Sequence, residues 1–296
     1  MAKKRIQIYI LLILFLFLIG STSQEELRVR DDRGVWITFS HPPQRIISLA
    51  PNITEILYLL NLDSRLVAVS NMCDYPPEAS AKPRVGGFNP SVEKIISLKP
   101  DLILGTTAGN RKETLRRLEL LGESVFVTSP YNIEQILQAI LKIGKIAGRE
   151  ELATAKIQQL RKRIESVTSR VKGLSRPRVL FLIWHQPLMS TGGNTFLNNL
   201  IRLAGGSSIS EDVKQNISIF SREEIIRRDP EVIFLPTFKE KRTLKKFLQQ
   251  WSMLTAVKKG SVYQLNEDLL LRPGPRIVDG LQLMAKILHP EAFVEK

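Results

Sequence analysis

The chain has very little of the residue chemistry that builds disulfides, metal sites and nucleophilic active sites. Its 296 residues include a single cysteine, so an internal disulfide is excluded and the fold must be held by its core. The three histidines are far apart in the sequence, and the HExxH pattern is absent, which argues against a bare-metal receptor. The G-x-S-x-G elbow, the P-loop and the dinucleotide-binding glycine pattern are absent too. We therefore predict no metal, no cofactor and no enzymatic activity.

Long apolar runs are also missing, except for one at the N-terminus. Lys3, Lys4 and Arg5 precede residues 6–19, which are almost wholly apolar, and small residues follow at 20–23. Fourteen apolar residues are short for a bilayer span and typical of a secretory signal. A lipoprotein box would need cysteine where this chain has Ser21. Residues 1–23 are thus predicted to be a signal peptide of a soluble exported, periplasmic protein, with an uncleaved anchor as the alternative.

The chain is strongly basic, because it has 43 lysines and arginines but only 29 acidic residues. Removing the signal peptide lowers the formal net charge from +14 to +11. The basic residues are scattered over expected helices at 111–119 and 239–247, without the interleaved aromatics of a base-stacking platform. We interpret this charge as a solvated surface and predict no nucleic-acid partner, although a steep salt dependence of DNA affinity would support one.

Short apolar runs alternate with amphipathic segments along the rest of the chain. Expected strands are residues 45–50, 65–70, 101–105, 124–128, 178–184, 231–236 and 261–265. Their continuous apolar character predicts strands buried on both faces, and alternation with helices predicts mostly parallel sheets. One expected helix, residues 52–60, starts with Asn52 as N-cap and Glu55 three residues later.

A longer helix is expected in the middle of the chain. Apolar residues between positions 150 and 172 recur at spacings of four and three, which forms one stripe on a rod of about 35 Å. The predicted domains are an N-terminal α/β lobe at 24–147, a linking backbone helix at 148–174 and a C-terminal α/β lobe at 175–296. The fold class is two Rossmann-like lobes joined by this helix.

One sequence unit occurs twice, once in each expected lobe. SVEKIISLKPDLIL (residues 91–104) and SREEIIRRDPEVIF (residues 221–234) share six of fourteen positions. A glutamate stands two residues after the serine in both copies, as Glu93 and Glu223. Either could merely favour a helix start by about 0.3–1 kcal/mol. Because both copies keep the Ser-x-Glu offset while neighbouring residues differ, we predict instead a two-point acidic surface for a basic partner.

Four stretches, residues 31–60, 73–79, 85–104 and 272–281, resemble the substrate-binding proteins of ABC importers for cobalamin and iron complexes. The CDYPPEA element at 73–79 is most similar to the cobalamin-binding branch. The resemblance implies two lobes on a backbone helix, a ligand held between them and small rocking motions. It also implies that Glu93 and Glu223 dock into arginine pockets of the ABC-transporter permease. We expect a monomer.

The resemblance also implies ligand-facing positions near the carboxyl ends of strands, where open α/β sheets bind ligands. The candidates are Met72, Tyr75, Phe88, Trp184, His185, Ile217, Asp268 and Arg272. Met72 and Ile217 stand where cobalamin binders carry aromatic residues. The resemblance to the cobalamin-binding branch predicts a corrinoid as the transported ligand, and these two departures make haem or a ferric siderophore the nearest alternative. An exported two-lobed hydrolase or transferase is the alternative from another class.

Overall fold

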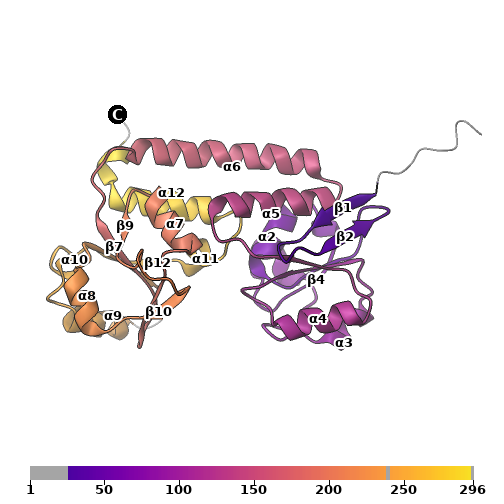
Figure 1. Cartoon of the computed structure of the whole chain (residues 1–296), viewed down its shortest axis with the longest axis horizontal. Helices are drawn as coiled ribbons and strands as arrows, with labels where there is room; N and C mark the ends of the chain where they lie inside the picture. The colour runs from indigo at the N-terminus through magenta and orange to yellow at the C-terminus, as the bar shows by residue number, and fades with distance from the viewer. Residues whose placement is uncertain (1–25, 238–240, 295–296) are drawn as a thin grey trace, which may run out of the picture.

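Two α/β lobes lie side by side beneath one long helix in the computed structural model (Figure 1), which describes residues 26–237 and 241–294. The predicted signal peptide lies outside the described residues. Helix α6 (Glu150–Val171) has 22 residues and is thus about 33 Å long. The predicted fold class is confirmed. Within the described ranges, no helix combines the length and apolarity that a membrane span needs.

The N-terminal lobe is built on a parallel sheet. Its strands, in spatial order, are β4 (Leu66–Val69), β3 (Ile46–Ser48), β5 (Leu102–Thr106) and β6 (Val125–Thr128). Its helices are α2 (Pro51–Leu59), α3 (Val92–Ser97), α4 (Lys112–Leu120) and α5 (Ile133–Ile146). Strand residues alternate between the faces: Ile46 packs in the cluster with α2 and α5, and Ile47 in the cluster with α3 and α4. Burial on both faces explains the continuous apolar runs.

The C-terminal lobe has a mixed sheet. Its strands, in spatial order, are β10 (Ile217–Ile219), β8 (Leu188–Thr191), β7 (Arg178–His185), β11 (Val232–Pro236) and β12 (Val262–Leu265), and β9 (Ser207–Ser208) also pairs with β7. Its helices are α7 (Phe196–Leu203), α8 (Arg222–Arg228), α9 (Lys241–Gln250), α10 (Thr255–Lys258), α11 (Glu267–Leu270) and α12 (Ile277–Leu288). The antiparallel strands β8 and β10 were not predicted, because they are short and lack a continuous apolar run.

A hairpin and three short 3₁₀ turns complete the fold outside the sheets of the lobes. An antiparallel hairpin of β1 (Leu27–Arg30) and β2 (Trp36–Phe39) precedes the first lobe. Short 3₁₀ turns occur at Asp63–Arg65, Pro77–Ala81 and Pro290–Phe293. Helix ends follow the turn chemistry of the sequence: Asn61 adopts a left-handed conformation with φ 53° after α2, and Gly122 does so with φ 88° after α4.

The predicted start of the first helix is wrong. Helix α2 begins at Pro51 after the N-cap residue Ala50, which makes no side-chain capping bond. Proline suits this position because the first helical N–H has no partner within the helix. The side chains of Asn52 and Glu55 are buried and bond instead to the C-terminal lobe, with Asn52 Nδ2 donating to the carbonyl of Pro273 over 3.3 Å. Contacts between the lobes thus take the place of the expected cap.

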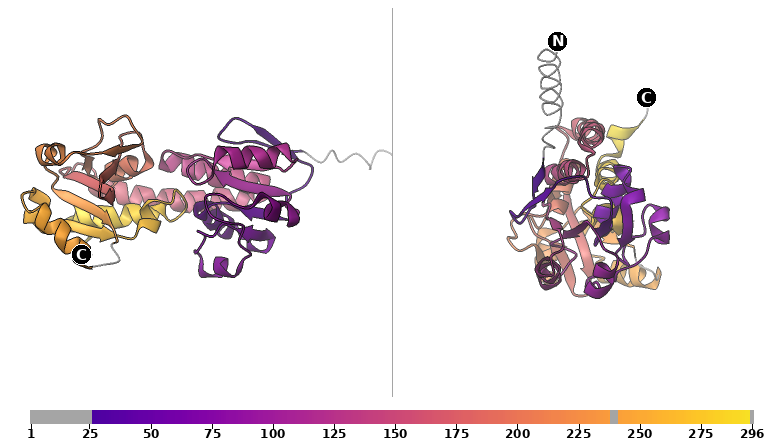
Figure 2. Two further views of the ribbon diagram at one scale, coloured as in Figure 1. Left: turned by 90° about the horizontal axis from the view of Figure 1, so that it is seen from below. Right: turned by 90° about the vertical axis from the view of Figure 1, so that its right-hand side faces the viewer.

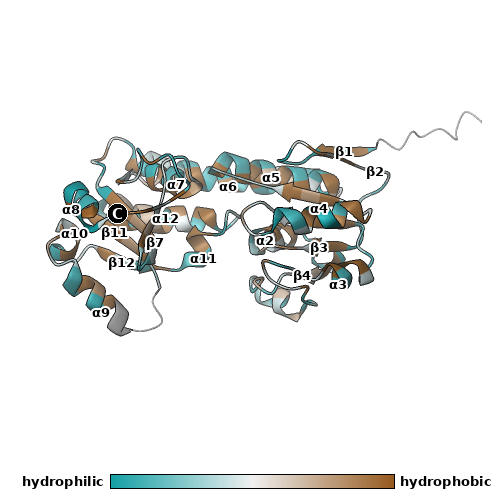
Figure 3. Ribbon diagram, turned by 60° about the horizontal axis from the view of Figure 1, so that its bottom comes forward, coloured by the Kyte–Doolittle hydropathy of each residue, from teal (hydrophilic) through white to brown (hydrophobic). Residues whose placement is uncertain are grey.

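One apolar cluster runs through both lobes. It contains residues of β3, α2 and α5 from the first lobe, residues of α6, and residues of α7, α12, β7 and β11 from the second. Figure 1 shows α5 and α12 lying along α6, and Figure 2 shows the two lobes side by side in a view from below. In Figure 3 the apolar residues gather in the central strands and in α5, whereas α8 is largely polar. The lobes share a core and are not separate globules on a tether.

This shared core predicts that both lobes unfold together. Leu160 lies on the buried face of α6, 7% exposed, so Leu160→Ala should lower the free energy of unfolding by about 2–5 kcal/mol. The exposed neighbour Lys162 is the control, and Lys162→Ala should change it by less than about 0.5 kcal/mol. Urea unfolding, followed by far-ultraviolet circular dichroism and by tryptophan fluorescence, measures the free energy of unfolding of both variants. Separate transitions for the two probes in the parent chain would contradict a common core.

Candidate functional site

Several of the predicted ligand-facing apolar side chains are exposed to solvent. Met72 and Tyr75 follow β4, and Trp184 and Ile217 lie on β7 and β10 of the other lobe. These side chains and Phe88 are between 43% and 63% exposed. The Trp184 indole donates its N–H to the Gln186 carbonyl over 2.8 Å, and this bond is made at the edge of the ring. Large exposed apolar side chains on both lobes are typical of a binding surface.

Two loops of the first lobe are joined so that Met72 and Phe88 lie on neighbouring segments. Asn71 donates its backbone N–H to the carbonyl of Gly86 over 2.8 Å, and its side-chain oxygen accepts from the Gly86 N–H over 3.2 Å. Gly86 has φ 113°, a conformation that L-residues rarely adopt. A side chain there would also come within 2.9 Å of the Pro90 backbone. Glycine is therefore required at this loop junction.

A network of acids and arginines crosses the boundary between the lobes. Arg276 donates to the two carboxylate oxygens of Glu55 over 2.6 and 3.0 Å. Arg272 lies 2.5 Å from a carboxylate oxygen of Asp74, 2.7 Å from one of Asp268 and 3.8 Å from one of Glu55. Glu55 and Asp74 belong to the first lobe, whereas both arginines and Asp268 belong to the second. The structure thus brings predicted residues Asp268 and Arg272 together.

The ionisation of these acids depends on how deeply each is buried. Burial raises the pKa of Glu55, against the attraction of Arg276 and Arg272 that lowers it. Asp74 is more exposed, and its hydrogen bond from Arg272 lowers its pKa. Both arginines are largely covered, with 15% of each side chain exposed. Removal of Glu55 would leave Arg276 partly buried without its counter-charge.

Further contacts fix the segment that carries the arginines. The Arg276 guanidinium lies over the Tyr75 ring at 3.8 Å from its centroid, a cation–π contact between the lobes. Gly274 packs on α2 so closely that a side chain there would come within 3.2 Å of Asn52. Tyr75 therefore packs against Arg276 on one side while 43% of its surface stays exposed.

Glu55 and Asp74 were not predicted as members of the site. Glu55 lies among the buried apolar residues Ile53, Ile56 and Leu57 of α2, and this pattern is a usable signal. A carboxylate on the buried face of a helix needs a cationic partner, which a sequence search could seek among the arginines. Asp74 lies in the CDYPPEA element at 73–79, which indicated the cobalamin-binding branch, but nothing in that element singled out its carboxylate.

His185 differs from Trp184 in its surroundings. It lines a hollow of about 490 Å³ within the second lobe, together with Lys246 and Phe247, and Trp184 does not line this hollow. The two rings are nevertheless neighbours, with centroids 5.4 Å apart and planes tilted by 41°. The structure therefore places His185 next to Trp184, although only His185 lines the hollow.

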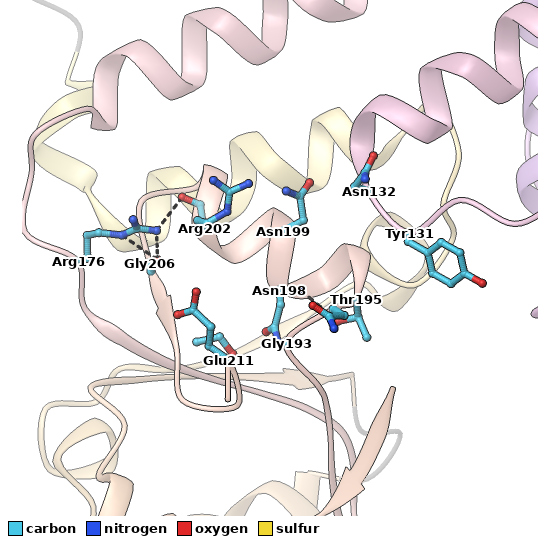
Figure 4. Close-up of a pocket in the computed structure, with 12 residues that line it drawn as sticks. Tyr131, Asn132, Arg176, Gly193, Thr195, Asn198, Asn199, Arg202, Gly206 and Glu211 are labelled. Atoms are coloured by element: carbon cyan, nitrogen blue, oxygen red, sulfur yellow. Dashed lines mark hydrogen bonds between the residues drawn. The ribbon is translucent and has the colours of Figure 1, made fainter. Parts of the chain in front are cut away.

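A different pocket lies between the lobes near α5 and α7 (Figure 4). Its volume is about 270 Å³, below the roughly 300–1,000 Å³ of most ligand pockets. Tyr131 and Asn132 line it from the first lobe, and α7 residues line it from the second. Arg176, at its edge, donates to the carbonyls of Gly206 and Arg202 over 2.8 and 3.2 Å. None of the predicted ligand-facing residues lines this pocket.

The duplicated unit has the same local structure in both lobes. Ser91 accepts a hydrogen bond from the Lys94 N–H over 3.2 Å, and Ser221 accepts one from the Glu224 N–H over 3.1 Å. Each helix, α3 or α8, is thus capped by its serine and leads through a proline into a central strand, β5 or β11.

The segments that lead from α3 into β5 and from α8 into β11 also have the same structure. Lys99 and Asp229, at equivalent positions, both have positive φ angles, 47° and 39°. Arg45 donates its Nε–H to the Lys99 carbonyl over 2.9 Å, and Arg178 does so to the Asp229 carbonyl over 3.0 Å. Equivalent acids at 101 and 231 accept from the backbone N–H groups of these arginines. The repeat is therefore structural in both copies, although several side chains differ.

The two glutamates of the repeat are both exposed. Glu93 accepts from the Ser91 hydroxyl over 3.2 Å and lies 3.2 Å from the Arg117 guanidinium, with 74% of its side chain exposed. Hydrogen bonds from its own backbone N–H and from Ser91 lower its pKa. The Glu223 carboxylate has no ion pair or hydrogen bond within the described ranges. Figure 1 shows α3 and α8 in the parts of the lobes away from α6.

Two lobes on a backbone helix, with exposed apolar side chains beside their boundary, define the class of two-lobed binding proteins. The chain belongs to the periplasmic binding protein family, which matches residues 46–269. The vitamin B12-binding protein of Yersinia pestis is 32% identical over 82% of this chain and 85% of its own length. A Bacillus subtilis ABC transporter substrate-binding lipoprotein is 28% identical over 88% of this chain and 84% of its own.

Solved structures agree with the fold. The periplasmic vitamin B12-binding protein of Vibrio cholerae has a TM-score of 0.76 at 29% identity, covering 86% of this chain and all of its own. A periplasmic haem-binding protein of Roseiflexus has a TM-score of 0.75 at 25% identity, covering 84% and 99%. The chain is thus a periplasmic binding protein of the ABC-importer type, a class that works with a permease and is not enzymatic. Within the described ranges, no three His, Cys, Asp or Glu residues are grouped to hold a metal ion.

The buried network predicts a large effect at Glu55. Glu55→Ala should lower the free energy of unfolding by about 3–5 kcal/mol, because it leaves Arg276 without its partner. Glu134→Ala removes an exposed pair with Arg161 and should cost less than about 1 kcal/mol. Urea denaturation of the two variants checks this difference. Equal losses of unfolding free energy in the two variants would show that the buried Glu55 pair stabilises the fold no more than an exposed pair does.

Proposed function

We propose that the protein captures a corrinoid at the interlobe boundary and delivers it to an ABC-transporter permease. The observation that carries this proposal is the 30–32% identity to vitamin B12-binding proteins over more than four fifths of the chain. Met72, Tyr75, Phe88, Trp184 and Ile217 form the apolar contacts, which suits a large macrocycle with extensive apolar edges.

Polar contacts would come from the second lobe. Asp268 and Arg272 stand at the edge of the interlobe network, where their remaining hydrogen-bonding capacity can meet ligand amides. His185 is the remaining candidate, with a ring nitrogen suited to hydrogen bonding or to a metal centre. Export by the N-terminal signal would place the protein outside the cytoplasm, and we propose that it acts as a monomer.

A second ligand class is favoured by two observations. The Roseiflexus haem-binding protein matches the fold nearly as closely as the Vibrio cholerae protein, with TM-scores of 0.75 and 0.76. Met72 and Ile217 also replace the aromatic residues that the cobalamin resemblance implies. Haem or a ferric siderophore is therefore the alternative ligand in the same role.

Ligand titration decides between these classes. Residues 24–296 titrated with cyanocobalamin, cobinamide, haem and a ferric hydroxamate should bind the two corrinoids, as measured by calorimetry and visible spectra. Trp184→Ala should weaken corrinoid binding on the order of tenfold or more, since an anchoring aromatic side chain is lost. Trp36→Ala, an exposed tryptophan on the β1–β2 hairpin, is the matched control and should bind as the parent does. Binding of haem alone would replace the corrinoid proposal.

We also propose that Glu93 and Glu223 dock onto the permease. Both are exposed, one on each lobe, at the start of helices with the same geometry. Basic groups of the partner would gain a charge-assisted contact at each lobe, and two spaced contacts fix the orientation of the protein on the permease.

Charge reversal tests this docking role. Glu93→Arg combined with Glu223→Arg should leave ligand affinity near that of the parent and abolish transport, measured as uptake by cells in which the variant replaces the parent. Glu150→Arg combined with Glu165→Arg makes the same charge change on exposed positions of α6 and should preserve uptake. Normal uptake with Glu93 and Glu223 reversed would refute the docking role.

A further inference from the structure

The repeated helices expose a second feature besides their glutamates. Each copy contains two adjacent isoleucines, and the first of them is buried: Ile95 is 0% and Ile225 is 1% exposed. The second is on the surface in both copies, with Ile96 37% and Ile226 40% exposed. The core therefore accounts for the first isoleucine of each pair and leaves the second only partly covered.

The exposed isoleucine shares a helix face with the glutamate. Residues three apart in a helix are neighbours on its surface, and this spacing separates Glu93 from Ile96 and Glu223 from Ile226. Both helices thus present a carboxylate and an apolar side chain one turn further on. Because the backbone geometry of the two copies matches, the same pair is displayed once on each lobe.

Neighbouring positions of these helices, exposed or half-buried, do not keep their chemistry. Lys94 is replaced by Glu224, which reverses the charge, and Ser97 is replaced by Arg227. An isolated exposed isoleucine would need no explanation. Its retention in both copies, beside residues that change from basic to acidic and from neutral to basic, points to a contact that both lobes make.

We propose that Ile96 and Ile226 are apolar docking contacts, which insert into hollows of the ABC permease next to the basic groups that receive Glu93 and Glu223. This inference rests on the docking role proposed above and assigns a composite acidic and apolar surface to each lobe. The partner must therefore offer a basic side chain beside an apolar hollow twice, once for each lobe. Isoleucine suits such a contact because its χ1 angle is already restricted in a helix.

The two kinds of contact respond differently to salt. Attraction between exposed charges is screened at high ionic strength, with a Debye length of about 8 Å at 0.15 M. Burial of an isoleucine has no such dependence. Loss of the glutamates should therefore reduce the salt dependence of docking, whereas loss of the isoleucines should weaken docking equally at all salt concentrations.

Binding of the fluorescently labelled protein to right-side-out membrane vesicles of the source organism measures docking directly. Ile96→Ser and Ile226→Ser should each weaken the saturable, competable binding on the order of tenfold, with an unchanged salt slope. Ile96→Leu combined with Ile226→Leu, which keeps the apolar area, should bind as the parent. Val35→Ser alters a similarly exposed apolar residue, 44% exposed, on the β1–β2 hairpin and is the control. Circular dichroism shows whether each variant is folded.

The outcomes separate this inference from the docking role itself. Weak binding of the serine variants with parent-like binding of the leucine variant supports the isoleucine contacts. If the serine variants bind like the parent while Glu93→Arg with Glu223→Arg does not bind, the isoleucine contacts are refuted and the glutamate docking stands. If reversal of both glutamates leaves binding unchanged, the docking role fails, and the isoleucine inference fails with it.

Discussion

The apolar cluster that both lobes share is the constraint on which the rest of the structure depends. Because α5, α6, α7 and α12 pack into one core, the lobes cannot separate without exposing residues such as Leu160 and Met284. Rigid packing of this kind allows small shear or rocking movements and opposes a wide hinge opening. The residues proposed to face the ligand and the permease, which are divided between the two lobes, are consequently held at a nearly fixed spacing.

A buried ion network between α2 and the second lobe also holds the two lobes together. Glu55 is taken out of water, which opposes its ionisation, and only the paired arginines keep the charged form acceptable. The same arginines hold the exposed residues Asp74 and Tyr75 at the boundary. Any ligand group that meets Arg272 therefore meets a side chain already oriented by three carboxylates. Such preorganisation lowers the ordering cost of binding.

Sequence patterns predicted the elements whose burial is continuous, and failed where contacts between distant residues decide the outcome. The seven expected strands and the central helix were found, because apolar runs and a regular stripe report burial directly. Asn52 and Glu55 resembled a helix cap in sequence, yet partners more than 200 residues away determine their positions. The strands β8 and β10 are short and their apolar runs are broken by serine or threonine, so the pairing of β8 with β7 and of β10 with β8 is visible only in the folded sheet.

The repeat separates the requirements of folding from those of recognition. Its serine caps, prolines, left-handed residues and arginine–acid contacts each satisfy backbone groups at a helix end or a strand entrance, so folding alone accounts for them. Folding also accounts for Ile95 and Ile225, which are buried. Glu93 also accepts from its own backbone N–H, but folding does not account for the second isoleucine of each pair, Ile96 and Ile226, which stay 37% and 40% exposed beside the glutamates. Residues that are duplicated without a role in the fold are best explained by a partner that contacts both lobes in the same way.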